Sequence, residues 1–172
     1  MIIGIVAVDR RGAIGKGGKL PWHYSADMKH FKETTIGHAC VMGRRTWLTL
    51  KKPLKERLNI VLSRQSEIQE RKEGGMGERA NGEIMQDSVI TLRDVGSVLS
   101  LEKYLRCDLF VIGGAQVYRS FLPYIEKWIV TEVPLTVEGA DAFVPENYLE
   151  GFNKEQSKEI DSALIVSWYR RD

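Results

Sequence analysis

Four short, almost wholly apolar runs set the main constraint on how this chain can fold. They cover residues 2–8, 39–42, 59–62 and 109–112, and Ile and Val recur in them. Runs of this kind are typical of strands buried on both faces, and such strands belong to parallel sheets. Parallel strands need crossover connections, and helix-length stretches separate several of the runs. The pattern predicts an α/β fold: a central, mostly parallel, twisted β-sheet with helices on both faces.

The segments between and after these runs complete the expected domain. We expect helices at about residues 26–35, 46–50, 97–105 and 115–122, and further strands at 89–91, 128–133, 156–160 and 164–169. The last two strands flank Asp161-Ser162, which predicts an antiparallel C-terminal hairpin. Residues 1–172 are expected to form one domain. A surface insertion is expected at about 65–87, where Glu, Arg, Lys and Gly dominate.

Composition excludes several classes of function. The chain has 25 basic and 23 acidic side chains in 172 residues, so it offers no broad field for nucleic acid or for a membrane surface. Its three histidines and two cysteines lack the spacing of metal ligands, so no metal is expected. The apolar run at residues 1–8 has no basic leader and is far too short to span a bilayer. We therefore expect a cytoplasmic protein.

The stretch from Gly15 to Phe31 combines a glycine-rich loop, a Pro-Trp corner and the start of a helix. Ser25 is expected to cap this helix, and Asp27 falls in its first turn, on or beside the face that carries Met28 and Phe31. Asp27 is open to two interpretations. It is either an ordinary first-turn acid favoured by the helix dipole, or a carboxylate in a cleft under a mobile lid.

Two strand-to-helix turns carry glycine, at 43–46 and at 113–114. Such glycines either make a tight turn or let a phosphate approach the bare backbone at a helix N-terminus. Because both turns follow neighbouring predicted strands, they indicate one extended ligand that carries phosphates. Arg44 and Arg45 lie in the first of these turns, and Arg64 follows the predicted strand at 59–62. No acidic residue that could bind a ribose hydroxyl follows about 20 residues later. This favours a 2′-phosphorylated dinucleotide.

A basic loop follows the second predicted helix and contains Lys51, Lys52, Lys55 and Arg57. Such a loop is either simply solvated or forms a clamp for a ligand carboxylate. Arg57 is the side chain best suited to bidentate contact with a carboxylate.

A set of short motifs then recurs in one order along nearly the whole chain. It consists of Ile14-Gly15, Leu20-Pro21-Trp22, Asp27, Phe31, Met42-Gly43-Arg44-Arg45-Thr46-Trp47, Pro53-Leu54, Arg57, Asn59, Ser63-Arg64, Ile112-Gly113-Gly114-Ala115-Gln116-Val117-Tyr118 and Thr131. In order and spacing this set resembles the dihydrofolate reductase family. An aspartate at position 27 resembles its bacterial type. Ala115 stands where members often carry a third glycine, and residues 139–143 resemble the family's Gly-Asp-Thr turn with one extra residue.

The resemblance implies an NADPH-dependent reduction of dihydrofolate to tetrahydrofolate, in a protein expected to be a monomer. It implies catalytic roles for Asp27, Trp22 and Thr131. The substrate site it implies consists of Ile5, Ala7, Asp27, Met28, Phe31, Leu50, Lys52, Leu54, Arg57, Ile112, Tyr118 and Thr131. The cofactor site it implies consists of Ala7, Ile14, Gly15, Leu20, Gly43, Arg44, Arg45, Thr46, Leu62, Ser63, Arg64, Ile112, Gly113, Gly114, Ala115, Gln116, Val117 and Tyr118. It further implies a cis Gly113-Gly114 bond, and diaminopyrimidine and pteridine antifolates as inhibitors.

Two other functions remain open from the sequence. One is a reductase of the same fold that acts on a ribosylated pyrimidine in riboflavin synthesis. The set of Pro21-Trp22, Asp27 and Phe31 argues against it, and so does Arg57, because that substrate has no glutamate tail. The other is a non-catalytic nucleotide-binding module. Oxidation of NADPH in the presence of dihydrofolate would separate all three.

Overall fold

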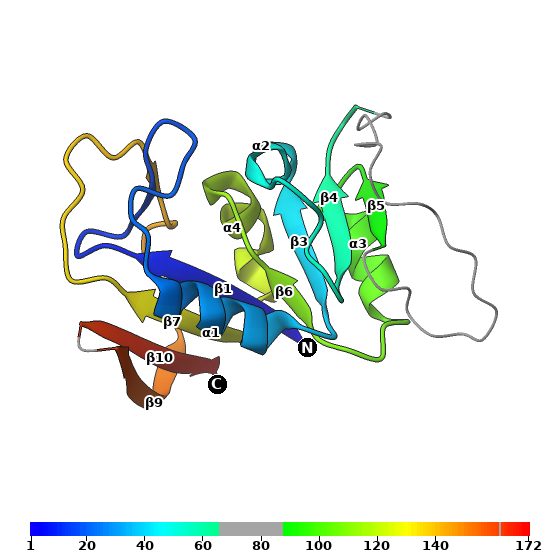
Figure 1. The fold of residues 1–172 in the computed structure, drawn as a ribbon. Coiled ribbons are helices and arrows are strands. Elements are labelled where there is room, and N and C mark those ends of the chain that lie inside the picture. The colour runs from blue at the N-terminus through cyan, green and yellow to red at the C-terminus, as the bar shows by residue number, and fades with distance from the viewer. Residues whose placement is uncertain (66–87, 162) are drawn as a thin grey trace.

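The structure is a computed structural model, and it describes residues 1–65, 88–161 and 163–172. The main sheet is built from β1 (Ile2–Val8), β3 (Ala39–Gly43), β4 (Leu58–Leu62), β5 (Val89–Leu92), β6 (Leu109–Val111), β7 (Lys127–Glu132), β9 (Phe152–Asp161) and β10 (Leu164–Arg171). Its strand order is β5-β4-β3-β6-β1-β7-β10-β9 (Figure 1). Apart from Gln65, the insertion expected at 65–87 lies outside the described residues.

The mostly parallel sheet predicted from the apolar runs is confirmed. The four runs form β1, β3, β4 and β6, and all pairings from β5 across to β7 are parallel. The C-terminal hairpin is also confirmed, because β10 pairs antiparallel with both β7 and β9. Strand β9 begins at Phe152, four residues before the predicted start. Most of its side chains are exposed and polar, so no apolar pattern marked its first half.

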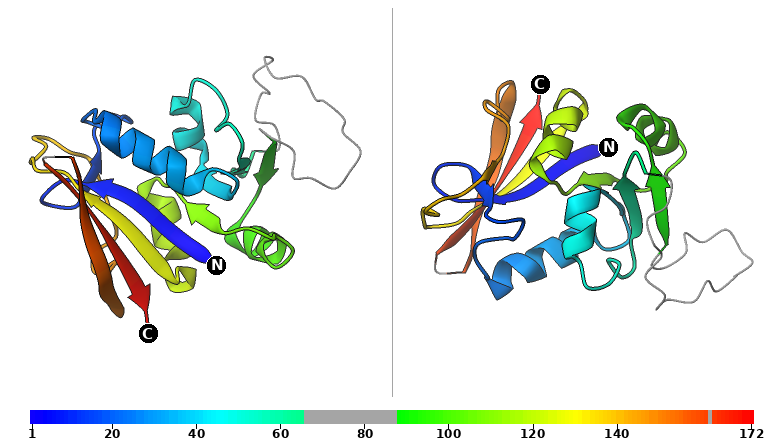
Figure 2. Two further views of the ribbon diagram at one scale, coloured as in Figure 1. Left: turned by 60° about the horizontal axis from the view of Figure 1, so that its bottom comes forward. Right: turned by 90° about the horizontal axis from the view of Figure 1, so that it is seen from above.

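Helices cover both faces of the sheet, as predicted (Figure 2). They are α1 (Ser25–Thr35), α2 (Arg44–Thr49), α3 (Val95–Glu102) and α4 (Ala115–Phe121), the last followed by a 3-10 turn at Leu122–Tyr124. Successive β1 side chains point to opposite faces. Val6 therefore joins the core with Val98 of α3 and with α4, while Ile5 packs in the cluster that Phe31 of α1 borders. No helix in the described part of the chain is long and apolar enough to cross a membrane.

Three helix starts differ from those expected. Helix α2 begins at Arg44 rather than at Thr46, inside the predicted glycine turn. Ser25 is the first residue of α1 rather than its cap; Tyr24 is the N-cap residue, and it makes no side-chain cap bond. Helix α3 begins at Val95, two residues early, because the carboxylate of Asp94 caps it by accepting the Ser97 N–H at 2.7 Å.

A second, two-stranded sheet joins two segments for which the sequence analysis expected no strand. It pairs β2 (Ala13–Gly15) with β8 (Ala142–Phe143), antiparallel. Strands this short show no periodicity, so the sequence did not reveal them. The pairing places the glycine-rich loop beside residues 134–145. These two segments form one wall of the cavity described next.

Candidate active site

A cavity of about 2240 Å³ lies at the carboxyl ends of β1, β3, β4, β6 and β7. In open α/β sheets this is the edge where ligands bind. Its wall contains every predicted site residue except Trp22, Lys52 and Arg57. A smaller adjoining pocket of about 400 Å³ is lined by Met28, Lys29, Phe31, Lys32, Leu54 and Arg57. The structure therefore brings together residues that the chain carries more than 100 positions apart.

Asp27 is a buried carboxylate in the wall of this cavity. It is only 8% exposed, although it stands in the first turn of a surface helix. Burial raises the pKa of Asp27, and a hydrogen bond with the Thr131 side chain and the nearby His30 oppose that rise. Thr131 belongs to β7 and is 3% exposed. A first-turn acid that merely favoured the helix dipole would be solvated, so the structure favours the interpretation of a carboxylate in a cleft.

Two aromatic side chains flank Asp27 along the chain. Trp22 is buried against Val133, Val137 and Leu164 rather than in the cavity wall, and its Nε1 has no hydrogen-bond partner among the described residues. His30 lines the cavity and stands edge-on to Trp168, with 5.9 Å between ring centroids. Burial lowers the pKa of His30, which favours its neutral form.

The two glycine turns lie against each other, as the sequence predicted. The Gly43 N–H donates to the Gly113 carbonyl oxygen at 2.9 Å. Gly113 has φ +111°, and a Cβ there would lie 3.1 Å from the Tyr118 ring. The Gly113-Gly114 peptide bond is cis, as expected. Tyr118 in turn donates from its hydroxyl to the Ile5 carbonyl at 2.7 Å, which fixes the turn to β1. Only a bare backbone fits here, and it leaves room for the close approach of a diphosphate.

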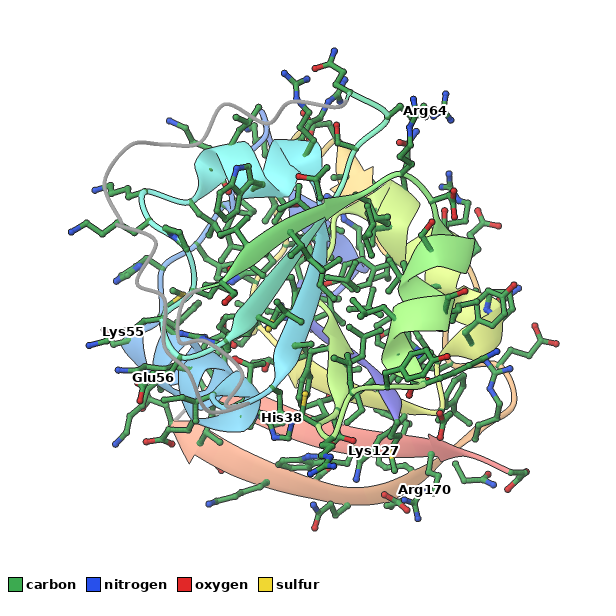
Figure 3. The ribbon with its side chains drawn as sticks, turned by 90° about the vertical axis from the view of Figure 1, so that its right-hand side faces the viewer. His38, Lys55, Glu56, Arg64, Lys127 and Arg170 are labelled. Atoms are coloured by element: carbon green, nitrogen blue, oxygen red, sulfur yellow. The ribbon has the colours of Figure 1, made fainter. Side chains whose placement is uncertain are left out.

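Several arginines line the same cavity where β3, β4 and β5 end. Arg44, Arg45 and Arg64 line it as predicted, and so does Arg93, which the sequence analysis missed. Arg93 directly follows β5, a partly exposed edge strand that sequence reasoning gave no functional weight. Its position after a parallel strand was the available signal, because that end of every strand faces the cavity. Figure 3 shows Arg64 at the opposite end of the molecule from Lys55 and Glu56.

Arg57 is held rigidly and is only 6% exposed, so the interpretation of a merely solvated side chain is wrong for it. Its Nη1 donates to Thr35 Oγ1 at 3.0 Å, and its Nε donates to the Lys55 carbonyl at 2.8 Å. The loop around it is fastened by Asn59, whose side chain accepts from Leu54 N–H and donates to the carbonyls of Leu54 and Arg57. A guanidinium fixed at the rim of the smaller pocket suits a ligand carboxylate.

The glycine-rich segment 9–24, which we expect to act as the lid, lies along the segment 134–141. The Gly17 N–H donates to Asp141 Oδ2 at 2.8 Å, and the Asp141 N–H donates to the Gly15 carbonyl at 3.1 Å. Asp141 therefore supports the lid despite the extra residue in its turn. Within the described residues, no group of three or more His, Cys, Asp or Glu side chains could hold a metal ion.

The fold and the cavity together suit an α/β enzyme that binds a phosphorylated dinucleotide, with room for a second ligand beside a buried carboxylate. Comparison with known proteins narrows this class. Residues 1–165 match the family model described as dihydrofolate reductase. The chain belongs to the dihydrofolate reductase family, whose activity is the NADPH-dependent reduction of dihydrofolate.

Individual relatives support this assignment. The chain is 39% identical to a dihydrofolate reductase of Mycobacterium tuberculosis over 140 residues, which is 78% of this chain and 73% of that protein. It is 34% identical to the enzyme of Bacillus subtilis over 147 residues, 85% of this chain and 76% of the relative. The solved Enterococcus faecalis dihydrofolate reductase, complexed with NADP(H) and RAB-propyl, superposes with a TM-score of 0.80 at 29% identity, covering 100% of this chain and 96% of that one.

Proposed function

We propose that this cavity reduces dihydrofolate with NADPH, and that Asp27 and Thr131 hold the pterin ring. The observation that carries this proposal is the buried Asp27 carboxylate, hydrogen-bonded to Thr131 in the wall of the cavity that also contains the glycine turns. The pterin offers a 2-amino group and a ring N–H side by side. A carboxylate with two acceptor oxygens matches that edge.

The reduced nicotinamide supplies a hydride, which reaches C6 of the substrate, and a proton reaches N5. The chain aligns the two rings and excludes water between them. Ile14, Gly15 and Leu20 of the lid cover the cavity, and the negative charge of Asp27 raises the proton affinity of the bound pterin. Trp22, near the end of the lid, anchors the lid through its packing on Val133 and Val137.

The cofactor fits the opposite part of the cavity. Gly43, Gly113 and Gly114 form a cradle of bare backbone. A Cβ on Gly43 would lie 3.1 Å from Val117 and one on Gly113 would lie 3.1 Å from Tyr118, so a side chain at either position would crowd its neighbour. This cradle suits the diphosphate. Arg44, Arg45 and Arg64 suit the 2′-phosphate, with Ser63 and Thr46 as neighbouring hydroxyl groups. Ala7 and Ile14 meet the nicotinamide carboxamide through their backbones. Leu62, Ile112, Ala115, Gln116 and Val117 complete the wall.

The smaller pocket supplies most of the remaining contacts that we propose for the substrate. Met28, Phe31, Leu50 and Leu54 give an apolar channel for the benzoyl ring, with Ile5 at the pterin end. Arg57, with Lys52 nearby in sequence, binds the glutamate tail. Diaminopyrimidine and pteridine antifolates bind the same site, because their protonated rings pair with Asp27. We further propose that the protein acts as a monomer in the cytoplasm.

A spectrophotometric assay tests this proposal. Purified protein is mixed with NADPH and dihydrofolate, and the loss of reduced-nicotinamide absorbance is followed. We expect turnover that depends on both reagents and that a diaminopyrimidine inhibitor abolishes. Binding of NADPH without turnover would support a nucleotide-binding module. Turnover of a ribosylated pyrimidine, but not of dihydrofolate, would support the other reductase.

A further inference from the structure

Asp9 is a buried carboxylate at the base of the lid that the mechanism above does not use. It follows the last residue of β1 and is only 4% exposed. Its Oδ1 accepts the N–H groups of Arg11 and Ala13, each at 2.8 Å, and its Oδ2 accepts the Val137 N–H at 2.9 Å. Leaving a charge buried is costly unless hydrogen bonds satisfy it. Here three backbone donors converge on one side chain, and these bonds lower the pKa of Asp9 against the opposing effect of burial.

The two carboxylate oxygens of Asp9 accept hydrogen bonds from different segments of the chain. Oδ1 closes the first turn of the lid, where the Asp9 N–H also donates to the Ala13 carbonyl at 3.0 Å. Oδ2 reaches a segment 128 residues away in the sequence. One side chain thus shapes the lid and fastens it to residues 134–141.

The contacts between these two segments differ in burial along the lid. At its base, the Arg10 N–H donates to the Leu135 carbonyl, and the Asp9 contact to Val137 is buried. Farther out, the bonds of Lys16 to Glu138 and of Gly17 to Asp141 are exposed. Exposed hydrogen bonds compete with water and open at lower free energy than buried ones. The outer part of the lid can therefore open while its base stays attached.

We propose that Asp9 is a positioning residue that fastens the base of the lid to Val137, so that the outer lid closes over the nicotinamide from a fixed hinge. The proposal rests on the proposed function, because Ile14, Gly15 and Leu20 of this lid are assigned to the cofactor. Asp9 acts through the lid and touches neither reacting ring.

The variant Asp9→Asn tests the proposal with little change in size. Its amide oxygen can still accept from Arg11 and Ala13, while its NH2 group then faces the Val137 N–H, donor against donor. The matched control is Glu138→Gln, which removes a charge from the same segment. The exposed Glu138 side chain has no hydrogen bond or ion pair within the described residues. Thermal unfolding identifies any general loss of stability in either variant.

We expect Asp9→Asn to weaken NADPH binding by about tenfold. The substitution removes the hydrogen bond from the Val137 N–H to the charged Asp9 carboxylate, and with it the attachment of the lid base. Dihydrofolate binding should change much less, because α1 and the Arg57 loop are intact. Without ligands, trypsin should cut the Asp9→Asn lid after Lys16 and Lys19 several-fold faster than in Glu138→Gln. Equal NADPH affinity and equal cleavage in the two variants would overturn the proposal.

Amide exchange in the parent protein provides a second test that needs no variant. Without NADPH, the Val137 and Ala13 amides should exchange slowly and the Gly17 amide fast, and NADPH should slow Gly17. A Val137 amide that exchanges as fast as Gly17 would show that the lid base is not fastened. These measurements need no turnover, so a negative result contradicts the role of Asp9 and leaves the proposed function untouched. The proposed function is tested only by the activity assay of the parent protein.

Discussion

Asp27→Asn is the substitution that tests the proposed chemistry most directly. Asparagine keeps the size of the side chain, so α1 and the cavity should survive. It loses the ionisable group, however, and sets an NH2 donor against the donors of the pterin edge. Thr131 keeps one partner at position 27, since its hydroxyl can both donate and accept.

The expected loss of turnover at neutral pH is roughly 10²–10⁴-fold, the usual value of acid–base assistance by a positioned side chain. The remaining rate should climb as pH falls, because solvent can then supply the N5 proton. A protonated diaminopyrimidine should bind roughly 10–100-fold more weakly, because its charge-assisted hydrogen bonds to the carboxylate are lost.

The same substitution should raise stability at neutral pH. Burial raises the pKa of Asp27 in the folded state, so the ionised side chain opposes folding at any pH above that value. Each unit of displacement corresponds to about 1.4 kcal/mol. The stability gained by the variant should be greatest above the folded pKa and should vanish below about pH 4, the unfolded value, where both states are protonated.

The assay is a pH–rate profile, an inhibitor titration and thermal unfolding of Asp27→Asn beside its parent. Glu33→Gln is a matched control on the same helix, because Glu33 is exposed and pairs only loosely with Lys29, at 3.8 Å. If Asp27→Asn retains turnover and inhibitor affinity within a few-fold of Glu33→Gln, Asp27 is an ordinary helix-start acid and the proposed chemistry is wrong.

Three further variants test other parts of the molecule. Changing Arg44 and Arg45 to Ala should raise the KM for NADPH by roughly 10–100-fold and that for NADH far less, because only NADPH carries the 2′-phosphate. Asn59→Ala should cost about 1–3 kcal/mol in thermal or urea unfolding and raise the KM for dihydrofolate more than that for NADPH, because Asn59 fastens the tail-binding loop. Gly4→Ala should cost about 1–3 kcal/mol in the same unfolding measurements, because its Cβ would lie 2.4 Å from the Trp128 ring.

The sequence predicted the sheet because burial on both faces leaves a strong signal. The apolar runs at residues 2–8, 39–42, 59–62 and 109–112 became adjacent parallel strands. Polar strands leave no such signal, which explains why the start of β9 and the short β2–β8 pair were missed. Those elements are held by backbone hydrogen bonds and by contacts between distant segments. Neither depends on a local periodicity.

The candidate site residues could be predicted where they directly follow a strand or begin a helix, and less well elsewhere. The two glycine turns directly follow β3 and β6, and Arg93 directly follows β5. Asp27 was instead marked by its place in the first turn of a predicted helix. The burial of Arg57 depends on Thr35 and Asn59, which are polar residues in positions that the sequence alone does not connect. The three donors around Asp9 include one from residue 137, and nothing near Asp9 in the sequence indicates it.

The register between β1 and β7 links the packing of the core to the position of Thr131 in the candidate active site. Gly4 stands opposite Trp128, and Ala7 stands opposite Thr131. The Trp128 ring occupies the space that a side chain at position 4 would fill, so this large residue fits only opposite a glycine. A slip of one residue would move every β7 side chain to the other face and bury Thr131 beneath α4. The packing of Gly4 against Trp128 therefore also places the Thr131 hydroxyl where Asp27 needs it, about three residues along the same strands.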